Sequence, residues 1–374
     1  MICDNRHPAA SVTTKLSSSL RLIRLERPSL TEYFFTALPR EDRPTQALLR
    51  EVAETLRDNN AVIVSQEVFA SVDSEDYIRR TIERTLGRPQ WPVTWIDSGD
   101  EQGFAGTQIW AISGTDVKPL THDGYVTGIV FEDRYATYCR IGGLSPVRMT
   151  QQRPRQADAV LRQMQQTLEA GHLDFAHTLR TWFYLDDILA WYGDFNKVRD
   201  AFFREHDVFN GLVPASTGIG AANIAHSALV AGLLAAKPKN GSMKALPVPS
   251  PLQCPAIDYG SSFSRAVELD LPDHRRLFIS GTASIAPEGH TIHVGHVGAQ
   301  TVKTMEVVAA ILESRGMQWS DVTRGIAYVR NPADIPVYTR YCHGHGLPLM
   351  PVVAMNSTIC RDDLLFELEV DAIR

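Results

Sequence analysis

Apolar residues recur three and four positions apart in two stretches of the first hundred residues, 45–57 and 75–86. This spacing places them on one face of an α-helix, so both stretches are predicted to be helices. Between them, the run Asn60–Ser65 is apolar except at its two ends, which is typical of a buried strand. Further strand-like runs, separated by Gly, Asp and Pro, are predicted at 91–96, 107–113 and 125–131. This part of the chain is therefore expected to be mixed α/β.

A helix-then-strand pattern occurs twice in the rest of the chain. The segment from Leu168 to Asp187 aligns without a gap with the segment from Leu312 to Asn331. Both copies read as a helix, a short polar turn, and an apolar run that starts at an arginine and carries a tyrosine four positions later. A unit used twice in this way indicates two related α/β layers.

The domain boundary is predicted where the pattern is interrupted. Residues 236–255 are rich in Pro, Gly and Lys, which is typical of a linker. We expect a flexible arm at 1–20, an N-terminal domain with an N-terminal extension at 21–240, and a C-terminal domain at 250–374. The C-terminal domain reads in the order ββ-α-β-α-ββ. The predicted fold class is α/β, more exactly described as α+β, with a mixed sheet in each of two domains and helices on one face of each sheet.

The amino-acid composition argues against several classes of function. The 374 residues are 44% apolar and carry 37 basic and 43 acidic side chains, a net charge of -6. No strong positive field points to nucleic acid or to anionic lipid. The five cysteines form no C-x-x-C pair, and no apolar run is long enough to span a bilayer. We therefore expect free thiols, a cytoplasmic location and neither a nucleic-acid nor a membrane partner.

Several motifs of the second half carry a family resemblance. The ββ-α-β-α-ββ order, with Ser-Gly-Thr after the second strand, resembles the Rid (YjgF) family of trimeric proteins. More specifically, residues 150–374 are similar to the chorismatases, although residues 1–100 are not covered by the resemblance. The segments that carry it are Arg180–Tyr184, Pro214–Ala221, Arg276–Ile285, Thr291–Gly295 and Cys360–Glu369.

The resemblance implies an enzyme of two fused Rid-like domains that needs no cofactor. Its substrate class would be a small carboxylate like chorismate, and its assembly a homotrimer or a monomer that imitates one. Chorismatases remove pyruvate from chorismate and leave either a dihydroxycyclohexadiene carboxylate or a hydroxybenzoate. We expect the branch that forms 3-hydroxybenzoate, as a lyase or hydrolase of secondary metabolism.

Glu367 is the expected catalytic acid. Protonating the methylene carbon of an enol ether near pH 7 requires a carboxylic acid whose pKa lies well above the ~4.3 of free glutamate. Glu367 lies between Phe366 and Leu368 in an apolar run, and its position in the motif matches the family's catalytic glutamate. Strand alternation places Glu369 on the same face, where each carboxyl can raise the pKa of the other. The alternative is that both carboxylates lie on a solvated sheet face or at a subunit contact.

Cys360 is the second expected catalytic residue. It lies where the product-determining position of the family falls, and the resemblance implies a thiol that helps an epoxide-like intermediate to become aromatic. A thiolate is a strong nucleophile, so the role is chemically reasonable. The alternative is a buried thiol that only fills space.

A dicarboxylate substrate needs cations or backbone donors. Arg265, which closes the segment that begins at Tyr259, matches a family arginine, and Arg330 is the second candidate for a carboxylate. Arg180 is a weaker third. The segment 216–220 offers backbone N–H groups without side-chain bulk, as an anion-binding turn requires. The full set of expected substrate-binding residues is Arg265, Tyr259, Arg330, Tyr184, Gly218, Gly220 and Ala221.

Three other interpretations stay open at this stage. His290, His293 and His296 are evenly spaced, but no acidic or thiol cluster completes a zinc set, so we expect no metal. A Rid-like enamine or imine deaminase, or another small-molecule enzyme of a biosynthetic pathway, would reuse the same pocket. The arginine of the Rid P-x-R pattern is missing at Pro348–Met350, which counts against generic imine hydrolysis. A ligand-binding module without catalysis is the third interpretation.

Overall fold

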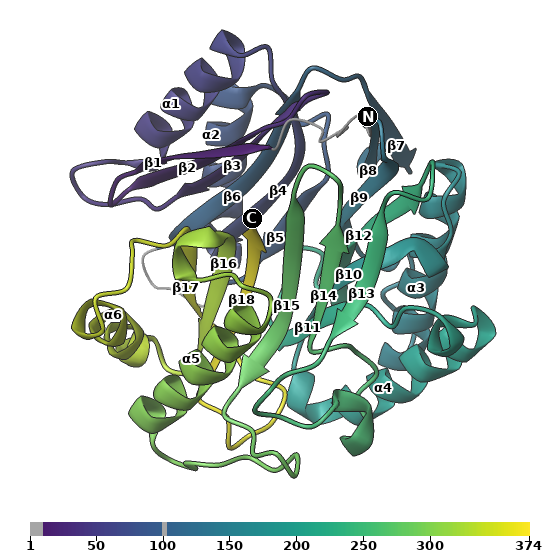
Figure 1. The fold of residues 1–374 in the computed structure, drawn as a ribbon, viewed down its shortest axis with the longest axis vertical. Coiled ribbons are helices and arrows are strands. Elements are labelled where there is room, and N and C mark those ends of the chain that lie inside the picture. Colours follow the sequence, from purple (N-terminus) through teal and green to yellow (C-terminus); the bar gives the residue numbers. More distant parts are fainter. Residues whose placement is uncertain (1–9, 99–102) are drawn as a thin grey trace, which may run out of the picture.

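The protein folds into three six-stranded mixed sheets with identical strand order, packed around a common centre (Figure 1). The structure, a computed structural model, describes residues 10–98 and 103–374. The α/β class is confirmed, and these described residues form one more sheet than the two expected. The predicted N-terminal domain of residues 21–240 holds two of the three.

The first sheet is built from the part of the sequence that showed no repeat. Its strands run in the order β1-β2-β3-β6-β4-β5, and helices α1 and α2 follow β3 and β4 along the chain. Its elements are β1 Ser11–Leu16, β2 Leu20–Glu26, β3 Thr31–Ala37, α1 Thr45–Asp58, β4 Val62–Ala70, α2 Glu75–Leu86, β5 Val93–Ile96 and β6 Phe104–Ser113. The flexible arm predicted at 1–20 is thus corrected in part, because backbone pairing with β2 fixes β1 as an edge strand. Residues 1–9 lie outside the described residues.

The second and third sheets repeat the same path. Elements of the second sheet are β7 Val117–His122, β8 Tyr125–Glu132, β9 Ala136–Leu144, α3 Arg153–Ala170, β10 Thr178–Leu185, α4 Ile188–Glu205, β11 Ala215–Gly220 and β12 Leu229–Pro238. Those of the third are β13 Lys244–Val248, β14 Ala266–Asp270, β15 Arg275–Ala283, α5 Val297–Ser314, β16 Val322–Val329, α6 Ile335–Gly344, β17 Val352–Asn356 and β18 Phe366–Ile373. The repeat read from the sequence is the pair α3–β10 and α5–β16. The expected linker contains β13, which pairs with β14 at the edge of the third sheet.

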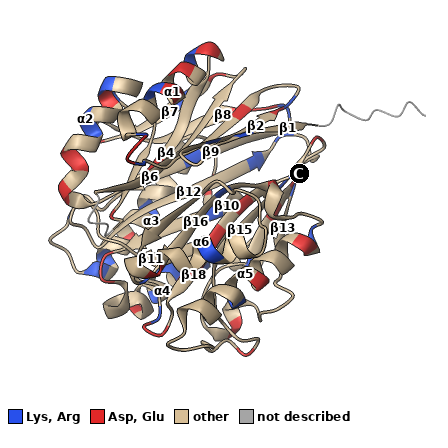
Figure 2. Cartoon of the chain, turned by 90° about the vertical axis from the view of Figure 1, so that its left-hand side faces the viewer, with Lys and Arg blue, Asp and Glu red and all other residues tan. Residues whose placement is uncertain are grey.

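Each sheet buries two faces. The outer face packs on the sheet's own helices, as α3 and α4 do with Phe195 and Leu161 against the second sheet. The inner faces of all three sheets meet in one large core cluster at the centre. A strand buried on both faces reads as a nearly continuous apolar run, which explains why β10 and β16 were visible in the sequence. Figure 2 shows basic and acidic residues interspersed over α1, α2 and the loops.

Equivalent turns of the three sheets meet in one buried ion cluster. Arg27 follows β2, Asp133 follows β8, and Asp273 lies between β14 and β15. Arg27 donates to Asp133 at 2.5 Å and to Asp273 at 3.0 Å, and all three side chains are fully buried. Carboxylates at all three of these equivalent positions would repel one another. Because the first unit has an arginine at this position, the three turns can pack together.

Candidate active site

Glu367 lies on β18 with its side chain enclosed by protein. It pairs with Ala283 of β15 on one side and with Tyr328 of β16 on the other, and it is 4% exposed. Its carboxyl makes no hydrogen bond to any of the described residues. Burial, and secondarily the negative charge of Glu369, raise the pKa of Glu367 to about 8, against the opposing charges of Arg180 and Arg265. Glu367 therefore carries its proton at neutral pH.

Gly281 makes room for this carboxyl. It belongs to the Ser-Gly-Thr motif at the end of β15, and a Cβ on Gly281 would overlap Glu367 Oε1. The motif is thus needed here for a close approach between a backbone and a side chain rather than for a turn. Its N–H donates to Thr217 Oγ1 of β11 at 3.0 Å, so the same residue also joins the third sheet to the second.

Glu369, two residues further along the strand, is held in its ionised form. Arg180 Nη2 donates to one carboxylate oxygen at 2.9 Å, and Trp182 Nε1 and Arg324 Nη1 donate to the other at 3.0 and 2.7 Å. Although burial acts to raise its pKa, Arg180 and Arg324 hold the pKa of Glu369 below its usual range. One face of β18 therefore presents a neutral acid beside a paired carboxylate, an arrangement that separates the roles of two identical groups.

Glu367 lies at the interface between the second and third sheets, and this interface is called the Glu367 cleft below. Its edge is fixed by hydrogen bonds from β11 to β15, in which the Ser216 N–H donates to Ser280 Oγ at 2.8 Å. At the far end the Gly220 N–H donates to the Thr358 carbonyl at 2.7 Å. The expected anion-binding turn at 216–220 is corrected by this result: the segment is strand β11, which pairs with β10 on one side and makes only isolated bridges, to Ser264 and Thr358, on the other.

Cys360, Arg265 and Tyr259 gather on the third-sheet side of this cleft. The guanidinium of Arg265 lies 5.2 Å from the centre of the Tyr259 ring, and its Nη2 is buried without a hydrogen-bond partner in the described chain. Cys360 is a partly exposed residue, but burial of its thiol, followed by the nearby Glu367 carboxyl, raises the pKa of Cys360 to about 12. The thiol is therefore protonated at neutral pH, and the catalytic role expected of Cys360 stays a prediction.

The wall that belongs to the second sheet contributes two residues that sequence reasoning missed, Tyr192 and Arg199 of α4. Cys360, Arg199, Glu367 and Tyr259 all lie near enough to Tyr192 to change its pKa, which is raised chiefly by burial. Arg199 is 1% exposed, donates to Asn196 Oδ1 at 3.0 Å, and has an Nε without a partner among the described residues. A charged residue on the apolar stripe of α4 was the signal that would have revealed it.

The remaining expected site residues have other contacts. Arg330 donates to the carbonyl of Asp362, so its guanidinium holds the loop that follows Cys360. Tyr184 is 2% exposed and lies near Glu369 and Arg324 at the centre. Gly218 lies beneath the ring of Tyr192 and so borders the cleft, whereas the N–H of Ala221 is bonded to the carbonyl of Leu185. The substrate contacts expected of these residues stay predictions.

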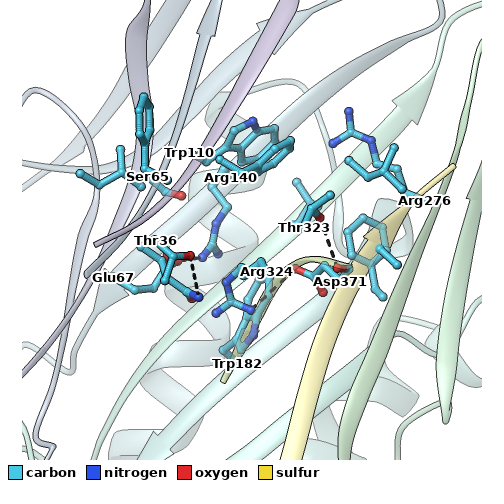
Figure 3. Close-up of a pocket in the computed structure, with 18 residues that line it drawn as sticks. Thr36, Ser65, Glu67, Trp110, Arg140, Trp182, Arg276, Thr323, Arg324 and Asp371 are labelled. Atoms are coloured by element: carbon cyan, nitrogen blue, oxygen red, sulfur yellow. Dashed lines mark hydrogen bonds and ion pairs between the residues drawn. The ribbon is translucent and has the colours of Figure 1, made fainter. Parts of the chain in front are cut away.

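A small cavity lies at the centre where the three inner faces meet (Figure 3). Its volume is about 50 Å³, and Trp182 forms part of its wall. The guanidinium groups of Arg140, Arg180 and Arg324 lie 4.3, 4.9 and 5.1 Å from the Trp182 ring. Arg140 pairs with Glu67 of the first sheet, so this cluster connects all three units. It fixes the partners of Glu369 rather than forming part of the cleft.

The histidines of the second half do not come together as metal ligands. Across residues 10–98 and 103–374, no three His, Cys, Asp or Glu side chains are grouped so that they could hold a metal ion. None of the helices in the described part of the chain is long and apolar enough to cross a membrane.

Comparisons with known proteins give matches in sequence and in structure. No protein-family model matches the chain. A chorismatase of Streptomyces rapamycinicus is 31% identical over 223 residues, which cover 53% of this chain and 65% of that protein. A 3-hydroxybenzoate synthase of Streptomyces hygroscopicus is 26% identical over 225 residues, 52% of this chain and 63% of that protein. The chain thus matches somewhat less than two thirds of the length of these relatives.

A solved structure extends the similarity over nearly the whole chain. A chorismatase crystal structure superimposes with a TM-score of 0.65 and 21% identity, covering 91% of this chain and 98% of the other. The chain has the chorismatase fold. The expected resemblance is confirmed by these matches, and because 91% of the chain is covered, the superposition also extends into the first hundred residues, which the sequence motifs had left without an assignment.

Proposed function

We propose that this protein cleaves the enolpyruvyl ether of chorismate and releases pyruvate and 3-hydroxybenzoate. The observation that carries the proposal is Glu367, a carboxyl that is enclosed, unpaired and protonated at neutral pH. Proteins with the two matching names, chorismatase and 3-hydroxybenzoate synthase, are the relatives found by sequence. An acid of this kind is what an enol ether requires, because the ether is stable until its methylene carbon is protonated.

The proton of Glu367 goes to the methylene carbon of the enolpyruvyl group. The bond between the ring carbon and the ether oxygen then breaks, and its electron pair stays with the oxygen, which becomes the ketone oxygen of pyruvate. The neighbouring ring hydroxyl oxygen then bonds to the vacated carbon and releases its proton to give the epoxide-like intermediate, and the oxygen takes a proton back when that ring opens. Opening of that ring and loss of a ring proton produce the hydroxybenzoate. The proton lost in aromatisation restores Glu367, so the reaction consumes no net water.

Guanidinium groups on opposite walls suit the two carboxylates of the substrate. Arg265 of the third sheet has a buried Nη2 without a partner in the described residues, and Arg199 of the second sheet has a buried Nε in the same condition. Unsatisfied buried donors cost free energy that an anionic ligand recovers. We assign one carboxylate to each arginine, with Tyr259 and Tyr192 on either side of the ring.

Cys360 acts in this proposal as a neutral thiol. Its pKa of about 12 leaves the sulfur protonated, so it contacts the epoxide-like intermediate through S–H and does not attack it as a thiolate. It steers the product because it lies close to Glu367 and to Tyr192.

We further propose that the chain works as a monomer in the cytoplasm. The three sheets already surround a shared centre, and Arg27 joins the equivalent turns of all three. One chain therefore already has the arrangement of three units that the expected trimer would build from three chains. The cytoplasmic location continues to rest on the cysteine content. No nucleic acid, membrane or cofactor enters the proposed reaction.

Incubation with chorismate tests the proposal. Chromatography of the mixture should show pyruvate and 3-hydroxybenzoate in equal amounts. If pyruvate appears together with a dihydroxycyclohexadiene carboxylate, the proposed ether cleavage is supported, but 3-hydroxybenzoate is rejected as the product. No pyruvate above background would reject the function, and ammonia release from an iminopyruvate source would favour the deaminase in its place.

A further inference from the structure

The interface between the first and second sheets repeats the architecture of the Glu367 cleft. In the cleft, the Gly281 N–H donates to Thr217 Oγ1 at 3.0 Å, and at the other interface the Gly143 N–H donates to Thr94 Oγ1 at 3.0 Å. Gly143 ends β9 as Gly281 ends β15, and Thr94 lies in β5 as Thr217 lies in β11. The two clefts are therefore related by the repeat of the fold.

Strand register identifies the residues that replace the catalytic ones. Glu367 pairs with Tyr328 of β16, and Val230 pairs with Tyr184 of β10 at the same point of the second sheet. The place of Gly218 is taken by Trp95 of the first sheet, since the residues before them, Thr217 and Thr94, are equivalent. The second cleft thus has an apolar residue where the first has its acid, so it is built for binding without proton transfer.

The third interface is closed. Gly106 of β6 occupies the position of Glu367 in the first sheet, where it pairs with Phe69. A Cβ on Gly106 would lie 3.6 Å from the Val353 side chain of the third sheet, and Gln108 Nε2 donates to the Gly325 carbonyl at 2.9 Å across the interface. At that point the first and third sheets are in direct contact.

The second cleft, in contrast, contains a cavity of about 910 Å³. This volume is in the range of small-molecule sites. Val230, Val126 and Leu144 form apolar wall, and Trp95 and Tyr125 add aromatic rings. Trp95 is half-buried, and its indole N–H has no partner among the described residues.

The charges at the rim of the cavity include one cation without a partner. Arg79 pairs with Glu75, and His122 lies 3.5 Å from Asp123. Arg88, which also lines the cavity, makes no ion pair or hydrogen bond within residues 10–98 and 103–374. Glu83 and Asp123 also line the cavity and are the acidic groups that a ligand's negative charge has to avoid.

We propose that this cavity binds a single-ring aromatic carboxylate, with its ring against Trp95 and Val230 and its carboxylate on Arg88. An aromatic ring fits the flat apolar wall, and a guanidinium favours a planar carboxylate. The site is distinct from the Glu367 cleft and does not rest on the proposed function, because it follows from the repeated architecture and from the lining residues.

A crystal soaked with 3-bromobenzoate locates the ligand directly. The anomalous signal of bromine should appear between Trp95 and Val230, in the native protein and equally in Glu367→Gln. Retention of the signal in Glu367→Gln separates this site from the catalytic one, whatever the outcome of the chorismate assay. A bromine peak confined to the Glu367 cleft, or no peak in this cavity, would overturn the proposal.

Titration of tryptophan fluorescence with benzoate tests the contacts. Arg88→Ala should weaken binding about tenfold or more, as expected for a charge-assisted hydrogen bond. Arg84→Ala is the matched control, because Arg84 is exposed on the same segment and does not line the cavity, and it should bind as the native protein does. Trp95→Phe should remove most of the fluorescence change. Benzyl alcohol binding as tightly as benzoate, or Arg88→Ala binding unchanged, would reject a carboxylate site.

Discussion

Glu367 and Glu369 lie on the same face of one strand, and the protein holds the first neutral and the second ionised. Burial and the charge of Glu369 raise the pKa of Glu367 to about 8, while Arg180 and Arg324 keep the pKa of Glu369 low. The difference comes from partners: Glu369 receives three hydrogen bonds from N–H donors, and Glu367 receives none from the described residues. The proposed chemistry and the predictions below depend on this separation.

Replacing the acid tests its role directly. Glu367→Gln keeps the shape of the side chain and cannot donate the carboxyl proton. We expect kcat for pyruvate release to fall by roughly a hundredfold to ten-thousandfold. Binding of chorismate, measured by calorimetry, should change little. A variant that keeps native turnover would show that Glu367 is not the acid.

The pH profile follows from the same pKa. The reaction needs protonated Glu367, so kcat should be constant well below pH 8 and fall about tenfold per pH unit above it. The native enzyme assayed from pH 6 to 10, with its folding followed by circular dichroism, provides the measurement. Activity that rises through pH 8 would require Glu367 to act as a base.

Glu367→Gln should lower activity but raise stability at pH 8. In the unfolded chain Glu367 loses its proton near pH 4.5, whereas the folded protein keeps it to about pH 8. Its contribution to stability is therefore present at low pH and is lost as the pH rises through this window. Glu367→Gln removes the penalty, so we expect the variant to be more stable than the native protein at pH 8 by up to a few kcal/mol, on the order of the linkage energy. Thermal unfolding at pH 4 and pH 8 gives the comparison, and a variant that is less stable at both would contradict the assigned pKa.

The charge of Glu369 helps to set the pKa of Glu367, which lies two residues away. Glu369→Gln removes the like charge beside Glu367 and leaves the positive charge of Arg180 uncompensated. Both changes lower the pKa of Glu367, so the pH at which kcat has fallen by half should move down. Unfolding should also become easier, by ~3–5 kcal/mol if the buried pair behaves as others do. An unchanged pH profile in a folded variant would exclude the tuning role.

Gly281 is needed for its lack of a side chain. In Gly281→Ala the added Cβ overlaps Glu367 Oε1 and moves the acid from its position. A displacement of about 1 Å costs roughly a hundredfold in rate, so kcat should fall by about that factor. Gly298→Ala is the matched control, because a Cβ there meets nothing within 4 Å, and it should keep native activity. Equal rates for the two variants would show that the acid does not depend on Gly281.

Cys360 controls the product in our proposal, and its thiol should be slow to react. Cys360→Ala should keep pyruvate release and change the aromatic product toward the dihydroxycyclohexadiene carboxylate. Because the pKa of Cys360 is about 12, alkylation by iodoacetamide at pH 7 should be far slower than for a free cysteine. Liquid chromatography and mass spectrometry measure both effects. Unchanged 3-hydroxybenzoate from Cys360→Ala would remove Cys360 from the mechanism.

Much of the local structure could be predicted from periodicity. The helix expected at 75–86 is α2, and the repeated helix and strand pairs are α3–β10 and α5–β16. The first sheet was not recognised as a third copy, because its sequence shares no motif with the others although its strand order is the same. The edge strands β1 and β13 were assigned to an arm and a linker, since exposed edges lack the apolar runs that mark central strands.

The sequence alone determined that an acidic residue would lie in an apolar strand near the carboxyl end, on the same face as a second one. Alternation along a strand is a local property, so it can be read from neighbouring residues. The tertiary structure decided which of the two carboxyls stays neutral, because Arg180 and Trp182 reach Glu369 from another sheet. It also decided that Arg199 lies near Cys360 and Tyr192 and that Tyr184 lies near Glu369. Solvation and charge act through space, so the pKa of each carboxyl depends on neighbours that are brought close only when distant segments of the chain pack together.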